Sequence, residues 1–376
     1  MSIHLCDAVL LGRRMRKAGI FKLTASMFGR SFGIMCNQDI SMKEDQKNIQ
    51  EVGAVPSSPG RRSFVYLRIG VALILILLIL RWVDFKVVMQ TIVKTDARYM
   101  VLITVIALFD RYLAAYKWNI LLKARGIDFS NFEAFKIYLS SGFVGTILPS
   151  TVGSDVVRAF RTKMSGGNFD QITATIVVER FIGLLAVALL AALGLTILIS
   201  TQEARFSKIH YFVWFFLVAL VCFLLLSAQP RMFSLIKRAL SRFEHSKPIR
   251  MYLDFHRAYM ELSRHWKVLL LFGVLSFLRH GVLVLMNFCG AKALAIPIPF
   301  VYVLAIIPVA AILVLLPISI DSIGVKEGVF IFLFGLAGLS PEQSLSLSLF
   351  MRVFRWILLI PAGFVFLYDS AKLKRS

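Results

Sequence analysis

The sequence is poor in acidic residues and in cysteine, and both shortages narrow what the protein can be. It has 21 Asp and Glu against 43 Lys and Arg over 376 residues, which gives a formal net charge of +22. Its four cysteines form no CxxC pair, so neither a disulfide framework nor a thiolate metal site is indicated. No RNP, zinc-finger or helix-turn-helix pattern accompanies the positive charge, which therefore favours anionic lipid over nucleic acid as a partner.

The sequence also lacks the short motifs of common membrane-associated enzymes. It contains no DxD, HxxxxD, HExxH or GxSxG pattern and no Walker A motif. We therefore expect no enzymatic activity, no metal and no cofactor. Any movement of a substrate would be passive or ion-coupled, unless a partner supplies the energy.

What the chain does contain is long apolar runs. Hydrophobic residues make up 58% of it, against about 45–50% in average globular proteins. The runs at 69–80, 184–199 and 211–227, extended by their flanks to roughly 17–25 residues, are long enough to cross a hydrocarbon core of about 30 Å. The sequence therefore predicts an all-α, polytopic integral membrane bundle.

Three regions are expected along the chain. Residues 1–63 read as a disordered basic extension; Met42 is an alternative start of translation, and a transit peptide is a further interpretation. Residues 64–370 form the membrane domain, and 371–376 a basic tail. Within the domain, 228–267 reads as an amphipathic loop with nine Lys or Arg against three acids. The positive-inside rule predicts that this loop and both termini are cytoplasmic, with the connection 81–99 on the other side.

Two apolar segments are broken by proline. The segment 132–149 ends at Pro149, and 300–320 contains Pro317; Ser and Gly follow each break. Such a break is tolerated in a membrane only where it is buried or lines a polar cavity. Two topologies remain open: about six spanning helices plus two re-entrant hairpins, or about eight transmembrane helices. The first includes an inverted repeat, which is typical of transporters.

Several charges lie within or beside the apolar segments, where each costs about 2.5–3.5 kcal/mol on insertion scales. We expect Asp110, Arg111, Arg279 and His280 to pair with one another and stabilise the bundle. The charges that follow the two breaks favour a functional interpretation, because Arg binds phosphate in a bidentate manner and half-helix N-termini attract anions. The predicted lipid-headgroup residues are Asp155, Arg158, Glu179, Arg180, Lys326, Glu327 and Arg352.

The motifs LPSTVGSDVVR, VVERFIGLL and LPISIDSIGVKEG, with a late MR, carry a resemblance to a known family. The region 65–370 resembles the transmembrane, flippase-like domain family of lysylphosphatidylglycerol synthase. The resemblance implies a lipid-translocating domain, in which Pro149, Gly153, Pro317 and Gly324 shape the helix breaks. By the same resemblance, the predicted lipid-headgroup residues match charged positions of the family's motifs.

The chain departs from that family pattern at three places. Gly153-Ser154 stands where Gly-Gly is common, Asp321-Ser322 replaces a small pair, and Lys326 stands where Arg is frequent. The added charge of Asp321 bears on headgroup preference. The full-length synthase also carries a soluble aminoacyl-transfer domain, whereas this sequence ends at Ser376, so no lysyl transfer is expected.

The leading hypothesis is a flippase or transporter in the plasma (inner) membrane. It moves an anionic phospholipid or a polyprenyl-phosphate glycolipid, held between the two hairpins. One alternative is a non-catalytic membrane partner of a separate lipid synthase or glycosyltransferase. A further alternative is a lipid-modifying membrane enzyme.

Overall fold

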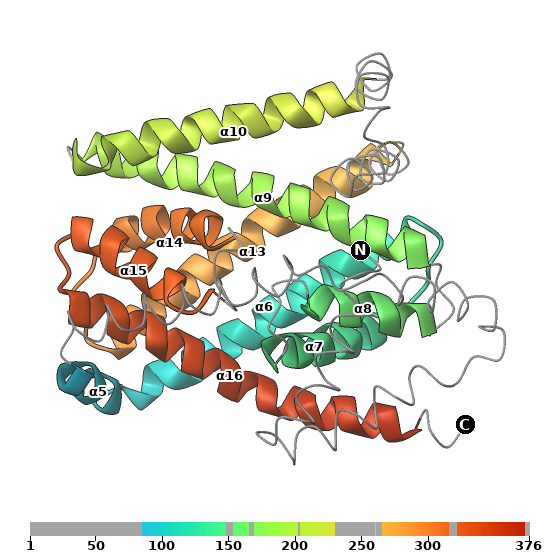
Figure 1. Ribbon diagram of the computed structural model, residues 1–376, viewed down its shortest axis with the longest axis horizontal. Helices are drawn as coiled ribbons and strands as arrows, with labels where there is room; N and C mark the ends of the chain where they lie inside the picture. The colour runs from blue at the N-terminus through green and yellow to red at the C-terminus, as the bar shows by residue number, and fades with distance from the viewer. Residues whose placement is uncertain are drawn as a thin grey trace, which may run out of the picture.

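The computed structural model describes residues 85–147, 153–164, 169–201, 204–229, 260, 265–315 and 322–372. Every regular element in these ranges is a helix, which confirms the all-α prediction (Figure 1). The elements are α5 (Phe85–Val93), α6 (Ala97–Lys123), α7 (Asn131–Ile147), α8 (Gly153–Met164), α9 (Phe169–Ser200), η2 (Ala204–Phe206), α10 (Ser207–Ala228), α13 (Trp266–Ala293), α14 (Phe300–Val314), α15 (Val325–Leu336) and α16 (Pro341–Lys372).

Five of the described helices are long and apolar enough to cross a membrane: α6, α9, α10, α13 and α16. The span predicted around the apolar run 69–80 lies outside the described residues. So do the extension 1–63, most of the basic loop 228–267 and the end of the tail. The connection 81–99, predicted as a loop, contains the helix α5. Val88 of α5 packs against Leu345 of α16. This tertiary contact stabilises a helix that the short sequence pattern did not indicate.

Side-chain caps fix where several helices begin. Asp96 accepts a hydrogen bond from the backbone N–H of Arg98 at the start of α6. Ser130 and Glu133 form a reciprocal capping box before α7. These caps satisfy backbone donors that have no partner inside the helix.

The two proline-broken segments form two short helical hairpins. In the first, Ser140 of α7 accepts a hydrogen bond from Arg161 of α8, and Gly145 lies against Ser154, so the two helices are antiparallel. The second joins α14 to α15. With 17 and 15 residues, α7 and α14 extend only about 25 and 22 Å, less than the roughly 30 Å of a hydrocarbon core. Figure 1 shows the hairpins at opposite ends of the bundle.

The two halves of the bundle pack reciprocally. The long helix that follows the first hairpin, α9, packs along α14 of the second, while α16 packs along α7 of the first. Figure 1 shows α9 and α16 running in opposite directions. The helices that precede the hairpins, α6 and α13, are antiparallel partners: the N–H of Asp96 donates to the carbonyl of Ala293, and Asp110 pairs with Arg279. This pairing of α6–α9 with α13–α16 is the arrangement expected of an inverted repeat.

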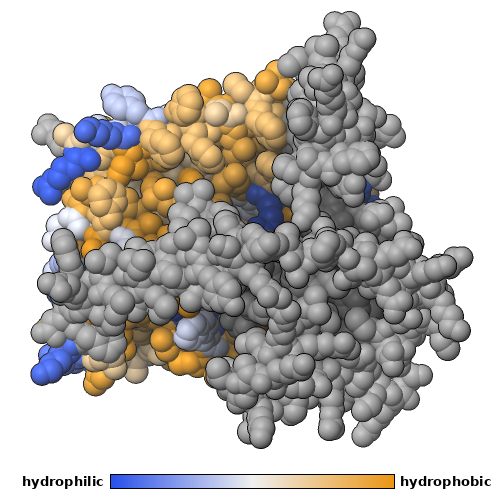
Figure 2. All heavy atoms as spheres, viewed as in Figure 1, coloured by the Kyte–Doolittle hydropathy of each residue, from blue (hydrophilic) through white to orange (hydrophobic). Residues whose placement is uncertain are grey.

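The outer surface of the described helices is mostly apolar. Figure 2 shows apolar side chains over much of the described face, with several hydrophilic residues along the left edge and a few farther in. Large apolar side chains such as Phe215 and Phe364 are 73% and 70% exposed. A surface of this kind suits contact with lipid rather than water.

Candidate functional site

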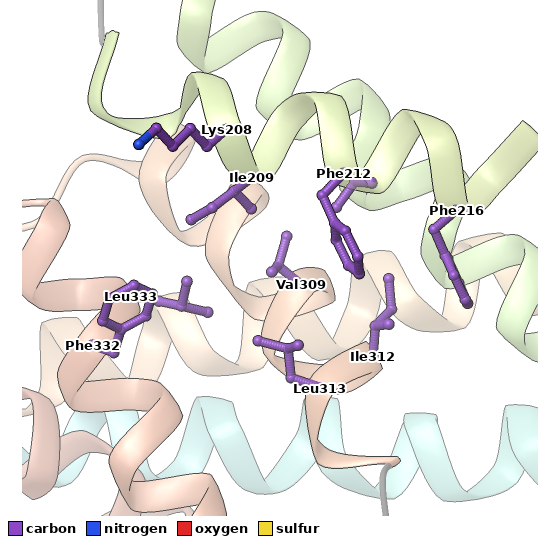
Figure 3. Close-up of a pocket in the computed structure, with 10 residues that line it drawn as sticks. Lys208, Ile209, Phe212, Phe216, Val309, Ile312, Leu313, Phe332 and Leu333 are labelled. Atoms are coloured by element: carbon purple, nitrogen blue, oxygen red, sulfur yellow. The ribbon is translucent and has the colours of Figure 1, made fainter.

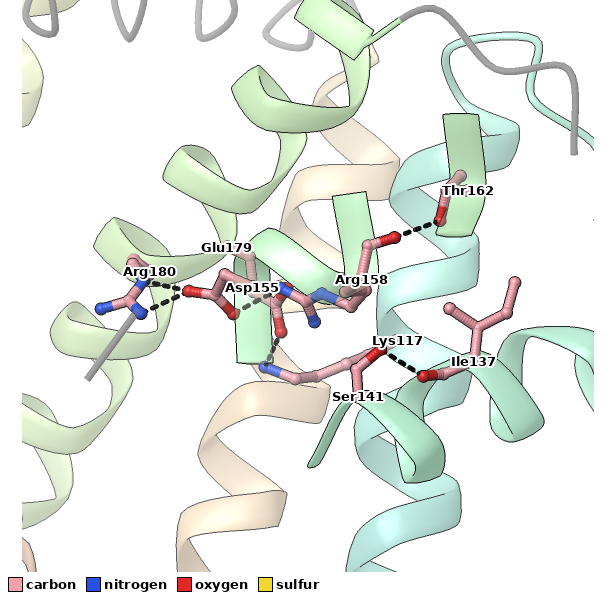
Figure 4. Close-up of polar contacts among 8 residues, drawn as sticks. All are labelled: Lys117, Ile137, Ser141, Asp155, Arg158, Thr162, Glu179 and Arg180. Carbon is pink, nitrogen blue, oxygen red and sulfur yellow. Dashed lines mark hydrogen bonds and ion pairs between the residues drawn. The ribbon is translucent and has the colours of Figure 1, made fainter. Parts of the chain in front are cut away.

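A cluster of five charged side chains joins the first hairpin to the long helices beside it (Figure 4). Lys117 comes from α6, Asp155 and Arg158 from α8, and Glu179 and Arg180 from α9. Arg158 Nη2 lies 2.8 Å from Glu179 Oε2 and 3.2 Å from Asp155 Oδ1. The spacing of three residues between Asp155 and Arg158 places both on one face of α8, as their sequence separation predicts. We call these five residues the hairpin cluster.

Arg158 is held rigidly within the hairpin cluster. Only 4% of the residue is exposed, and its guanidinium lies 4.8 Å from the ring of Trp118 and 5.2 Å from that of Tyr138. Aromatic faces attract a cation through their quadrupole, most strongly where water is excluded. Two carboxylates and two rings therefore surround this guanidinium.

Lys117 is buried on the other side of Glu179. Its Nζ lies 3.8 Å from Glu179 Oε1 and 3.2 Å from the hydroxyl of Ser276 on α13, and only 3% of the residue is exposed. It also lies over the ring of Phe272. Lys117, itself on α6, thus links the hairpin cluster to α13.

Arg180 differs from the other cations of the cluster because its side chain is 45% exposed. It donates from Nε to Asp155 Oδ2 at 2.7 Å and forms an ion pair with the same oxygen through Nη2. The residue lies about 17 Å from the first residue of α9, at 1.5 Å per residue, within a helix long enough to span the bilayer. A half-exposed guanidinium at that position faces either lipid or a polar cavity, and both are settings in which an anionic group stabilises it.

The hairpin cluster has a surplus of positive charge. Its ion pairs include three cations, Lys117, Arg158 and Arg180, but two carboxylates, Asp155 and Glu179, which leaves a formal charge of +1. Each of the three cations takes part in at least one of these ion pairs, and Arg180 is the exposed one.

A second charged pair occupies the corresponding place in the other half. Arg352 of α16 donates to Glu327 Oε1 of α15 from Nη2 at 2.7 Å and from Nε at 3.0 Å. Ser348 also donates to this oxygen, at 3.4 Å. Glu327 Oε2 accepts from the N–H of Gly324 at 2.8 Å, which caps the start of α15. The two side chains are each 6% exposed, so this pair is buried.

The two halves place their acids and arginines alike. Asp155 and Glu327 both lie in the first turn of the second hairpin helix. Each is paired with an arginine 25 residues later, on the long helix that follows. The ion pairs given above each lie within one half, so the structure shows two separate clusters.

The structure places the other predicted residues as follows. Lys326 is partly buried on α15, with its Nζ 5.2 Å from the ring of Phe330. Gly153 begins α8, and Gly324 precedes α15 with a φ of 80°, a conformation that glycine adopts without strain. Pro149, Pro317 and Asp321 lie outside the described residues.

The charges assigned to the bundle itself pair as predicted. Asp110, which is 1% exposed, forms an ion pair with Arg279 across the α6–α13 contact, with its Oδ1 3.0 Å from Arg279 Nε, and lies 3.4 Å from Arg111. His280 follows Arg279 on α13. The predicted pairing of Asp110, Arg111 and Arg279 is therefore confirmed, and their part in stabilising the bundle stays a prediction.

Sequence reasoning missed Lys117 and the two rings around Arg158. The apolar pattern alone predicts a span over 100–116, which leaves Lys117 out, whereas α6 continues to Lys123. The available signal was the position of Lys117 within an apolar helix. A predicted span that stops before Lys117 does not contain this signal. No comparable signal exists for Trp118 and Tyr138, because aromatic residues are common in membrane helices.

Among the described residues, no group of three or more His, Cys, Asp or Glu side chains is arranged to hold a metal ion. The two hairpins, the reciprocally packed long helices and the buried ion pairs define a polytopic helical membrane protein.

The chain belongs to the family of the lysylphosphatidylglycerol synthase TM region, whose model matches residues 65–363. It is also 22% identical over 132 residues to the UPF0104 membrane protein PH1989 of Pyrococcus horikoshii. That match covers 34% of this chain and 39% of the relative. No solved structure matches the chain. The predicted family is thus confirmed.

Proposed function

We propose that this protein moves an anionic lipid between the two leaflets of a membrane. Its substrate is an anionic phospholipid or a polyprenyl-phosphate glycolipid. The observation that carries the proposal is the half-exposed guanidinium of Arg180, which pairs with Asp155 within a helix long and apolar enough to span a membrane. The family supports it, since its description is that of the membrane region of a lipid-modifying synthase.

The ion pairs of the hairpin cluster suit reversible binding of a phosphate. A headgroup phosphate replaces Asp155 at Arg180, where the planar guanidinium offers two parallel donors. Asp155 then keeps its contact with Arg158 Nη2 at 3.2 Å, so no buried carboxylate loses every partner. The exchange leaves each charge paired before and after binding, which keeps its cost low.

The orientation follows from charge. With the basic loop 228–267 and both termini in the cytoplasm, the hairpin α7–α8 enters from the cytoplasmic side and α14–α15 from the opposite side. We place the protein in the plasma (inner) membrane. Anionic lipids are its partners, and a separate glycosyltransferase or lipid synthase is a further partner.

Leaflet exchange of labelled lipids in liposomes tests the proposal. The lipids are phosphatidylglycerol, cardiolipin, phosphatidylethanolamine and a polyprenyl-phosphate sugar, each compared with protein-free liposomes. We expect selective exchange of one anionic lipid and a loss of about tenfold or more in Arg180→Gln, since a hydrogen bond to a charged group contributes about 1.5–3 kcal/mol.

Arg98→Gln is the matched control, because Arg98 is exposed at the start of α6 and its removal changes the net charge equally. Equal loss in both variants would contradict a role for Arg180. Absence of exchange for every lipid, with folded protein, would favour the interpretation as a non-catalytic membrane partner.

A further inference from the structure

An apolar groove lies between α10 and the second hairpin. It has a volume of about 200 Å³ and is lined by ten residues of α10, α14 and α15. Nine of them are apolar, and Figure 3 shows Lys208 at one end of the row. The helix α10 packs along α9. The groove lies on another side of α10, between this helix and α14 and α15.

The α10 wall of the groove is straight. Lys208, Phe212 and Phe216 are spaced four residues apart, so they lie on one face of the helix over about 12 Å. Val309 and Ile312 of α14 line the opposite wall. The groove therefore runs along a membrane helix and has apolar side chains on both walls.

The end of the groove at Lys208 is cationic. Lys208 is exposed in the first turn of α10. Three residues earlier, the exposed Arg205 donates to the carbonyl of Leu336 at 3.4 Å, which places its guanidinium at the end of α15. Two cations therefore lie where the groove reaches the end of its helices.

We propose that this groove binds one acyl chain of an anionic phospholipid, with the lipid phosphate at Lys208. The apolar lining excludes a polar occupant, and the cationic end selects a negative headgroup over a zwitterionic one. The bound chain fills the space between α10 and the second hairpin, and so supports that hairpin from its lipid-facing side. The site is separate from the hairpin cluster and does not depend on lipid movement.

Photo-crosslinking in nanodiscs tests this site. The probes are phosphatidylglycerol and phosphatidylcholine with the same diazirine-bearing acyl chain, at equal mole fraction, and labelled residues are located by peptide mass spectrometry. We expect phosphatidylglycerol to label the groove at Phe212 and Phe216 about fivefold more than phosphatidylcholine, the preference that one basic residue near a membrane surface supplies. Tyr211, 72% exposed on α10 but outside the groove, should show no such preference.

Lys208→Gln should reduce groove labelling by phosphatidylglycerol to the phosphatidylcholine level. Lys94→Gln is the control, because Lys94 is an exposed lysine in the α5–α6 connection, outside the groove. Equal labelling by the two lipids, or a preference that Lys208→Gln leaves intact, would show ordinary bilayer contact and overturn the proposal. Binding is read without transport, so absent leaflet exchange would not affect it.

Discussion

The ion pair between Glu179 and Arg158 provides a direct test of the hairpin cluster. Glu179 lies 2.8 Å from Arg158 and 3.8 Å from Lys117, and the three side chains are 10%, 5% and 3% exposed. Glu179→Gln keeps the volume and one hydrogen-bond acceptor but removes the charge. The cluster then has three cations against one carboxylate, a formal charge of +2, and two of those cations, Lys117 and Arg158, are buried.

Removing one partner of a buried ion pair costs about 3–5 kcal/mol, because the other charge is left uncompensated. We expect Glu179→Gln to lie near the lower limit, about 3 kcal/mol, since its amide oxygen still accepts a hydrogen bond. Arg158→Met should also destabilise the protein. The double variant removes both charges, so its loss should be smaller than the sum of the two single losses by about 1–3 kcal/mol.

The measurement is the free energy of unfolding of the purified protein in mixed detergent micelles. Asp128→Asn is the control: it removes an equal charge from an exposed position between α6 and α7, and should change stability by no more than about 0.5 kcal/mol. If the losses in the double variant are additive, or if Asp128→Asn costs as much as Glu179→Gln, the reasoning about buried compensation is wrong.

Two further predictions concern backbone positions, and stability in micelles checks both. Gly194→Ala should destabilise by about 1–3 kcal/mol, because the new methyl group would lie 2.6 Å from the carbonyl oxygen of Leu304 where α9 crosses α14. Gly183→Ala in the same helix meets nothing within 4 Å and should be neutral or stabilising; similar losses would contradict the close crossing. Gly324→Ala should cost about 1–3 kcal/mol, since its φ of 80° strains other residues. Gly328→Ala, with open space around it, is the reference, and equal effects would refute the strain.

Much of the fold could be predicted because a membrane simplifies the problem. Apolar length indicated the long helices, and a proline followed by Ser and Gly indicated where a helix must break. The separation of Asp155 and Arg158 placed them on one helix face without any structure. These are local properties, and local sequence is sufficient to define them.

The pairing of charges between helices could not be predicted in the same way. Which acid meets which arginine depends on how α8 is rotated against α9, and that rotation is set by contacts distant in sequence, such as the rings of Trp118 and Tyr138 on Arg158. The burial of Lys117 likewise depends on the α6–α13 contact. The sequence therefore indicated the set of charges, while their partners required the packing.

The two halves share a framework but differ in charge and exposure, and the difference bears on where an anionic headgroup rests. Moving a phosphate to the Glu327–Arg352 pair requires displacing a buried carboxylate that also caps α15 through the N–H of Gly324. At Arg180 the phosphate meets an exposed guanidinium, and the displaced Asp155 retains Arg158. Binding in the first half therefore costs the Asp155–Arg180 ion pair, whereas binding in the second costs an ion pair and a helix cap. If the protein moves an anionic lipid, the headgroup in this conformation rests at the first hairpin.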